Sequence, residues 1–143
     1  MPYKYLDDIA IADVAFEAWG TTLEELFTAA AEATMNLMVA DLATIASREK
    51  RKIELEDESL DLLLFNLLQE LIFYKDAERL LLRMEKVQLK QIDGVFRLEA
   101  EACGEEIDPS KHQLGVDVKA ITLHRFQVKK TPEGWQADVI VDV

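Results

Sequence analysis

Two aspartates at opposite ends of the chain are the side chains best placed to do chemistry. Asp13 lies in an alternating run over residues 11–19, and Asp142 lies in a similar run over residues 135–143, each on a strand face that also carries bulky apolar side chains. If these strands are neighbours, the two carboxylates and the chain-terminal carboxylate of Val143 crowd together. Their mutual repulsion raises the proton affinity of one of them or attracts a hard divalent cation. The spacing leaves open the alternative that each aspartate sits at an exposed strand end.

Other kinds of catalytic or cofactor site find little support. The five glycines are isolated, so neither a phosphate-binding loop nor a dinucleotide-binding turn can be assembled. A closed zinc site would need both histidines, His112 and His124, together with Cys103 and a carboxylate. Cys103 lies in an apolar alternating run, so packing explains it better than a nucleophilic cysteine–histidine pair. We therefore expect no catalytic residue and no bound nucleotide.

The charge of the chain argues against direct binding to nucleic acid. Its 143 residues include 28 acidic and 16 basic ones, a formal net charge of −12 that repels phosphate groups. A basic cluster over residues 48–52 is short and lacks interleaved aromatic residues for base stacking. We interpret it as a solvated turn leading into a strand, with an RNA site as the lesser alternative.

The apolar content predicts one compact domain over residues 1–143, without contact with a membrane. Half of the residues are apolar, which suffices for a core at this length. The most apolar stretch, Leu60 to Tyr74, is shorter than the ~20 residues that cross a bilayer and contains charged side chains. The single cysteine excludes an internal disulfide, and no targeting segment is recognisable. We expect a cytoplasmic protein.

The sequence predicts two helices. Thr22 and Glu25 have the spacing of a capping box, so the first helix should run from residue 23 to about 39. Asp57 can cap a second helix that runs to about residue 76 and is apolar over most of its circumference. Its narrow polar strip, Asn66, Gln69 and Glu70, meets solvent or borders a site.

The remainder of the chain is predicted to be sheet. Strands are expected over residues 3–19, 53–56, 81–92, 95–103, 118–129 and 135–143, with a loop over 104–117. Asp93-Gly94 predicts a tight hairpin, and residues 131–134 predict a second. The expected fold is α+β: two helices packed on a mainly antiparallel sheet, in the order β-β-α-β-α-β-β-β-β.

A family resemblance extends over nearly the whole chain. The segments that carry it are Tyr5-Leu6, Ala12 to Val14, Trp19 to Phe27, Met38 to Asp41, Gln69 to Leu71, Gly104 to Asp108 with His112, Lys119 to His124, and Val139 to Val143. In order and spacing they resemble the archease family, small accessory proteins that assist the GTP-dependent RNA ligase joining tRNA exon halves.

The resemblance implies a non-catalytic activator of that ligase, which promotes its guanylylation and multiple turnover. It implies a divalent cation, Ca²⁺-like, held by Asp13, Asp41, Asp142 and the terminus at Val143. GTP would be used by the partner ligase and not by this chain.

The resemblance also suggests supporting residues and one departure. Lys119, Glu70 and His124 are expected to contact the partner or support the site. The family usually has His-Thr where this chain has Ala10-Ile11, so an imidazole and a hydroxyl are lost. We therefore expect weaker metal binding here than is usual for the family.

Two functions of other classes remain as alternatives. One is a small metal-dependent phosphate-ester hydrolase that uses Asp13 and Asp142 around the cation. The other is a chaperone-like protein-binding module with no connection to RNA.

Overall fold

The computed structural model describes residues 2–6 and 13–143. The elements, in chain order, are β1 (Tyr3–Leu6), β2 (Asp13–Gly20), α1 (Leu23–Met38), the short 3-10 helix η1 (Leu42–Thr44), β3 (Glu49–Asp57), α2 (Leu60–Glu78), β4 (Leu80–Ile92), β5 (Val95–Glu106), β6 (Ala120–Thr131) and β7 (Gly134–Asp142). This order confirms the predicted α+β class and its sequence of strands and helices.

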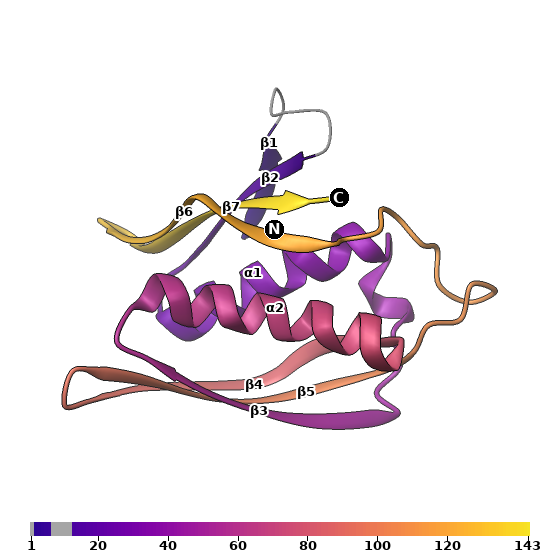
Figure 1. Ribbon diagram of the computed structural model, residues 1–143, viewed down its shortest axis with the longest axis horizontal. Coiled ribbons are helices and arrows are strands. Elements are labelled where there is room, and N and C mark those ends of the chain that lie inside the picture. Colours follow the sequence, from indigo (N-terminus) through magenta and orange to yellow (C-terminus); the bar gives the residue numbers. More distant parts are fainter. Residues whose placement is uncertain (1, 7–12) are drawn as a thin grey trace.

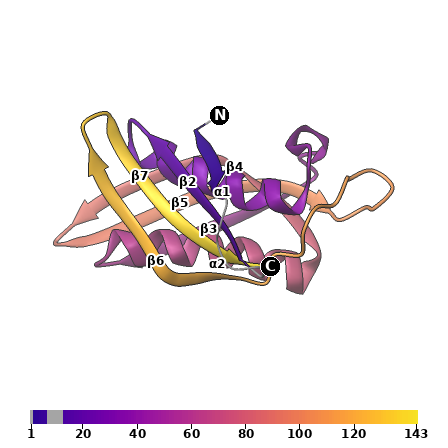
Figure 2. The same ribbon diagram turned by 90° about the horizontal axis from the view of Figure 1, so that it is seen from above.

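The strands form two antiparallel sheets with the helices between them (Figure 1). One sheet has the order β1-β2-β7-β6 and the other the order β3-β5-β4. Seen from above, the first sheet runs across both helices (Figure 2). Helix α2 contacts β6 on one side and β3 and β4 on the other. This double burial explains why α2 is apolar over so much of its surface.

The helix caps agree with the sequence at α1 and differ at α2. Thr22 caps α1, its hydroxyl accepting from the Glu25 N–H at 3.1 Å. The expectation that Asp57 caps α2 is wrong, because Ser59 takes that position and accepts from the Leu62 N–H. Asp57 instead ends β3, where its carboxylate accepts from the Ser59 N–H at 2.9 Å.

The basic cluster over residues 48–52 does not form a turn. β3 begins at Glu49, so most of the cluster is already strand. Arg51 pairs with Glu78 at 2.7 Å, and Lys52 pairs with Glu54 at 3.0 Å. Acidic neighbours thus neutralise these cations along the strand.

The two hairpins lie where the turn residues predict them, but two strand ends differ. Asp93 and Gly94 both have positive φ, 52° and 78°, as a two-residue turn with right-handed twist requires. β5 continues to Glu106, past Gly104 where we expected a loop. A Cβ at Gly104 would lie 1.6 Å from the Leu81 carbonyl oxygen, so this glycine serves a close approach of β4 rather than a turn. β6 begins at Ala120, two residues later than predicted.

Strand β6 is an edge strand that α2 protects. It is irregular between Thr122 and Gln127. Side chains of α2 accept from its backbone: Gln69 from the Ile121 N–H at 2.9 Å and Asp61 from the Val128 N–H at 2.7 Å. These bonds satisfy edge groups that would otherwise be open to pairing. Of the helices described, none is long and apolar enough to cross a membrane.

Candidate functional site: an acidic pair on neighbouring strands

Asp13 and Asp142 are direct cross-strand partners at the end of the β2–β7 ladder. The prediction that they lie on neighbouring strands is confirmed. Directly opposed residues share a face of the sheet, with Cβ atoms about 4.5–5.5 Å apart. Two like charges in this position repel each other, so a cation or a basic group from a partner would stabilise the pair.

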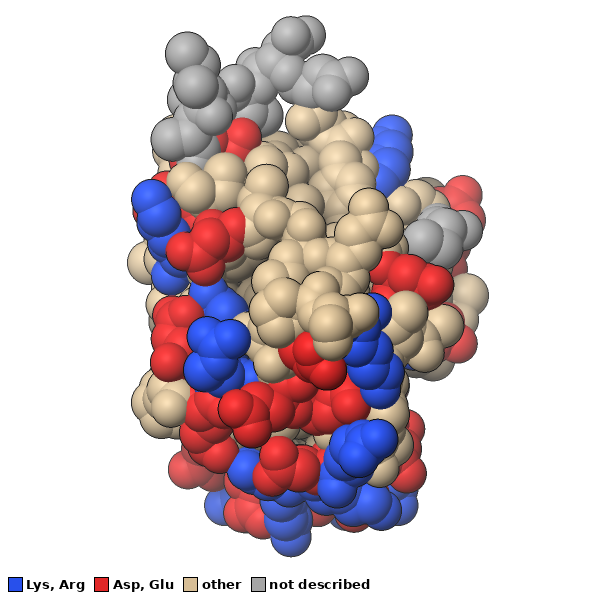
Figure 3. Space-filling model, turned by 90° about the vertical axis from the view of Figure 1, so that its right-hand side faces the viewer, with Lys and Arg blue, Asp and Glu red and all other residues tan. Residues whose placement is uncertain are grey.

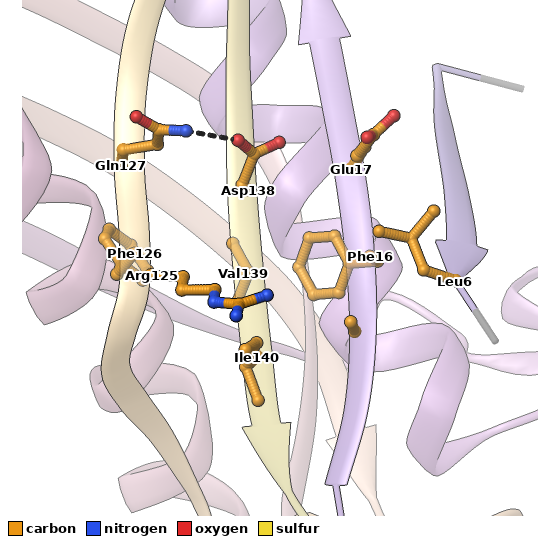
Figure 4. A pocket seen from close by; sticks show the side chains of 10 residues that line it. Leu6, Phe16, Glu17, Arg125, Phe126, Gln127, Asp138, Val139 and Ile140 are labelled. Carbon is orange, nitrogen blue, oxygen red and sulfur yellow. Dashed lines mark hydrogen bonds between the residues drawn. The ribbon is translucent and has the colours of Figure 1, made fainter. Parts of the chain in front are cut away.

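A second carboxylate pair lies on the same face of the sheet. Glu17 is the cross-strand partner of Asp138, and Ala15 and Ile140 are partners between the two acidic pairs. Ala15 and Ile140 are 3% and 6% exposed. They lie in the floor of an open hollow of about 460 Å³, which Leu6 and Arg125 also line (Figure 4).

The two acidic pairs differ in their counter-charges. Glu17 pairs with Lys4 at 3.4 Å. Asp138 accepts from the amide groups of Gln127 and Gln136 at 2.6 and 2.9 Å. The side chains of Asp13 and Asp142 form no hydrogen bond or ion pair with another residue that the structure describes. The uncompensated pair is therefore the one that the sequence singled out.

Asp41 has a structural task at the end of α1. It follows α1, and its carboxylate accepts from the Ala43 N–H at 3.0 Å, which caps η1. Within residues 2–6 and 13–143, no three His, Cys, Asp or Glu side chains are grouped so as to hold a metal ion. Both ribbon views place the end of α1 and the end of β7 in the same half of the molecule (Figures 1 and 2). Two of the three predicted aspartates are thus brought together.

The other predicted site residues lie on α2, on β6, in the segment before β6 and at the end of the chain. The Lys119 N–H donates to the Asp142 carbonyl at 2.9 Å, so the backbone of Lys119 adjoins the pair and its side chain is exposed. Glu70 is half-buried on α2, beside Gln69, and forms no ion pair with a described residue. His124 is exposed on the irregular part of β6. Val143 packs against the core.

The departure at Ala10-Ile11 lies outside the described residues. The three residues considered for zinc are in separate environments. Cys103 is buried and contacts Glu85, His112 is buried beside Glu105, and His124 is exposed. Burial raises the pKa of the Cys103 thiol, as expected of a packed rather than a reactive cysteine.

Sequence reasoning missed a buried ionic cluster around Glu105. Its carboxylate, 8% exposed, accepts from the Ala46 N–H at 2.7 Å, from Lys111 at 2.6 Å and from His112 at 2.9 Å, and its other oxygen pairs with Arg48 Nε at 3.3 Å. These bonds, led by the Ala46 N–H, lower the pKa of Glu105 to about 2. His112 Nδ1 accepts from the Asp108 N–H, so Nε2 carries the proton that Glu105 accepts.

The family of the chain follows from comparison with known proteins. The sequence profile of the Archease protein family matches residues 3–143. The chain belongs to the archease family. The archease of Thermococcus gammatolerans is 38% identical over 133 residues, which are 92% of this chain and 93% of that one. The archease of Archaeoglobus fulgidus is 35% identical over the full length of both.

Solved structures of similar chains have the same fold. The solution structure of protein 1598 of Methanobacterium thermoautotrophicum superposes with a TM-score of 0.85, at 33% identity and 99% coverage of both chains. A Thermotoga maritima protein, described as an archease and possible chaperone, superposes with a TM-score of 0.60 at 16% identity, covering 94% of this chain and 93% of that one. The second likeness concerns the archease fold alone.

Proposed function

We propose that this archease is a non-catalytic activator of a GTP-dependent, tRNA-splicing RNA ligase. Family membership supports an accessory role. The observation that carries the proposal is the Asp13–Asp142 pair, two opposed carboxylates without a counter-charge among the described residues. Such a pair is costly for folding, so it fits a site that is completed by something the chain itself does not supply.

A divalent cation, Ca²⁺-like, is the first candidate to complete the site. Asp13 and Asp142 would hold it, and their carboxylates supply fewer oxygens than the six to eight that Ca²⁺ prefers. When bound, the cation neutralises the pair and leaves positions open to water or to groups of the ligase. Asp41 accepts the Ala43 N–H through one carboxylate oxygen, so its other oxygen would be the one to contribute.

Metal binding by the isolated protein should therefore be weak. With a dissociation constant of about 1 mM, about 10 mM Ca²⁺ stabilises the folded state by roughly 1.4 kcal/mol. We expect this to raise the melting temperature by about 2–5 °C, and not to do so in Asp13→Asn. Tight binding that is unaffected by Asp13→Asn would contradict this site.

The ligase would carry out the ligation reaction. This chain would help the ligase to return to its starting state after each product. A guanylylated enzyme must discharge its nucleotide, release RNA and regain a competent arrangement of GTP and metal. An acidic edge that docks close to the ligase site can bias these steps through charge. The chain would thereby raise the number of turnovers without contacting RNA.

A ligation time course with GTP and a divalent cation tests the proposal. The ligase is supplied at far lower concentration than its RNA substrate, with and without this protein. We expect the reaction to stall near one product per ligase without the protein and to continue through many turnovers with it. An unchanged time course would overturn the proposed function.

A chaperone-like role is the second candidate, supported by the printed description of the Thermotoga maritima protein as a possible chaperone. It predicts protection of unrelated proteins from aggregation. If the protein suppressed aggregation of several unrelated proteins and did not change ligase turnover, this role would replace the first.

A further inference from the structure

The last turn of α2 carries a buried lysine. Of the lysines that the structure describes, Lys75 alone is buried, with 9% of its surface exposed. Its ammonium group donates to the Asp117 carboxylate at 2.9 Å and to the Val118 carbonyl at 2.7 Å, and it pairs with the Asp76 carboxylate at 2.6 Å. Burying a charged group is costly unless it is paired and hydrogen-bonded. The three partners of Lys75 meet this condition, and the lysine in turn fixes their positions.

Lys75 remains charged in this position. Burial alone lowers the pKa of Lys75, but hydrogen bonds to Asp76 and Asp117 outweigh it, so the pKa lies above its usual value. The helix dipole also favours a cation in the last turn of α2. The contact between α2 and residues 117–118 is therefore charge-assisted, which is the stronger class of hydrogen bond.

Asp117 and Val118 lie near the end of the segment between β5 and β6, residues 107–119, on the right-hand side of the molecule in Figure 1. Figure 3 shows this side, where Lys and Arg side chains lie among Asp and Glu side chains over the lower part of the surface. Ion pairs exposed in this way contribute little to stability. Val118, in contrast, is 0% exposed, and its carbonyl is one of the groups that Lys75 binds. Lys75 thus holds the end of the segment from inside the molecule.

The residue after Val118 anchors the strand that carries one aspartate of the acidic pair. The Lys119 N–H donates to the Asp142 carbonyl at 2.9 Å, and Ala120 is the cross-strand partner of Asp142. Asp142 is the last residue of β7, and the end of a strand ladder opens more readily than its middle. On its other side Asp142 is opposed by Asp13, whose charge repels it. The end of β7 therefore depends on residues 119–120 to stay in register while it carries this repulsion.

We propose that Lys75 is a positioning residue for the Asp13–Asp142 pair, an inference that rests on the proposed function. Lys75 holds residues 117–118, and these hold the Lys119 N–H against the Asp142 carbonyl, so that the end of β7 stays beside β2. The contacts of Lys75 are with Asp76 and residues 117–118. It therefore acts on the pair through the backbone of residues 117–119.

Amide hydrogen exchange of Lys75→Met tests this link without the ligase. Methionine keeps an unbranched apolar side chain of similar length but cannot donate a hydrogen bond. We expect the Lys119 N–H to exchange about tenfold faster than in wild type, because local opening becomes easier. The Ile107 N–H, at the other end of the segment, donates to the Arg79 carbonyl at 2.8 Å and should exchange as in wild type. Equal acceleration of both amides would mean that Lys75 only stabilises the fold, and would overturn the proposal.

Two aspartates that pair with Lys75 provide a matched comparison that does not disturb the core. The side chains of Asp76 and Asp117 are 58% and 76% exposed, so both variants should fold. Asp117→Ala removes one of the two contacts from Lys75 to the segment and should accelerate exchange of the Lys119 N–H several-fold. Asp76→Ala removes a contact within α2 and should leave this amide unchanged. Equal exchange of the Lys119 N–H in the two variants would contradict the link.

Calcium binding and ligation connect the link to the acidic pair. Lys75→Met should lose most of the rise in melting temperature that Ca²⁺ gives wild type, and at saturating protein it should stimulate the ligase several-fold less. Asp76→Ala should match wild type in both measurements. If Lys75→Met stimulates the ligase as wild type does, the inference is overturned and the proposed function stands. If wild type does not stimulate the ligase, the proposed function is overturned, and the exchange and calcium results decide whether Lys75 positions the pair.

Discussion

At the residue scale, two groups of carboxylates have opposite surroundings. Asp13 and Asp142 repel each other on an open sheet face, whereas Glu105 is buried with three donors. The face of each aspartate could be predicted from strand alternation, and the family resemblance implied that the two share a site. The Glu105 cluster could not be predicted, because Gly104 suggested a loop where β5 continues. A buried carboxylate is recognisable only once its donors, which come from residues 46 and 111–112, are placed around it.

Replacing Glu105 should lower stability in a pH-dependent way. Glu105→Gln removes the charge that three hydrogen-bond donors and Arg48 compensate, so we expect a loss of about 3 kcal/mol in the free energy of unfolding at pH 7. The folded pKa is lowered from 4.5 to about 2. This stabilisation is therefore complete above about pH 4.5 and is lost as pH falls toward 2. Urea unfolding at pH 7 and pH 3 measures it.

The comparison between pH values is the decisive part of that experiment. Other carboxylates titrate in both proteins and cancel in the difference. The difference in the free energy of unfolding between wild type and Glu105→Gln should be smaller at pH 3 than at pH 7. If this difference were the same at both pH values, the stability of the cluster would not depend on the ionised carboxylate of Glu105.

At the scale of elements, the sequence predicts each helix and strand better than their assembly. Period-2 alternation identifies which face of β7 is apolar, but it does not show which sheet a strand joins. The structure shows two sheets where the sequence predicted one, and α2 lies between them. The signal for this arrangement was the nearly continuous apolar surface of α2, which one sheet alone would not cover.

A pair of leucines on α2 tests the double burial. Leu67 is 0% exposed and Leu62 is 40% exposed. We expect Leu67→Ala to cost about 3–5 kcal/mol, because the cavity would open in a layer closed on both sides. Leu62→Ala should cost under about 1 kcal/mol. Chemical denaturation of both variants measures the difference, and similar losses would contradict the central position of α2.

At the scale of the whole molecule, net charge directs association. The formal charge of −12 disfavours RNA and favours a basic protein surface. Composition alone predicts this much. It does not predict that Asp13 and Asp142 become neighbours, because only the folded chain pairs β2 with β7.

Salt should therefore change how fast the protein meets the ligase. Raising ionic strength from about 50 to about 500 mM should lower the association rate constant about tenfold and change the dissociation rate far less. Surface plasmon resonance with immobilised ligase measures both. An association rate that does not depend on salt would exclude electrostatic steering.

The central claim is that the Asp13–Asp142 pair is the working part of the protein, and ligation product per ligase against time tests it most directly. Asp13→Asn is compared with Glu17→Gln, which lies on the same strand face but whose carboxylate already pairs with Lys4. We predict that Asp13→Asn abolishes multiple turnover without lowering the melting temperature, which should rise slightly because the repulsion with Asp142 is relieved, while Glu17→Gln stimulates as wild type does. Undiminished stimulation by Asp13→Asn, or equal losses in both variants, would contradict the account.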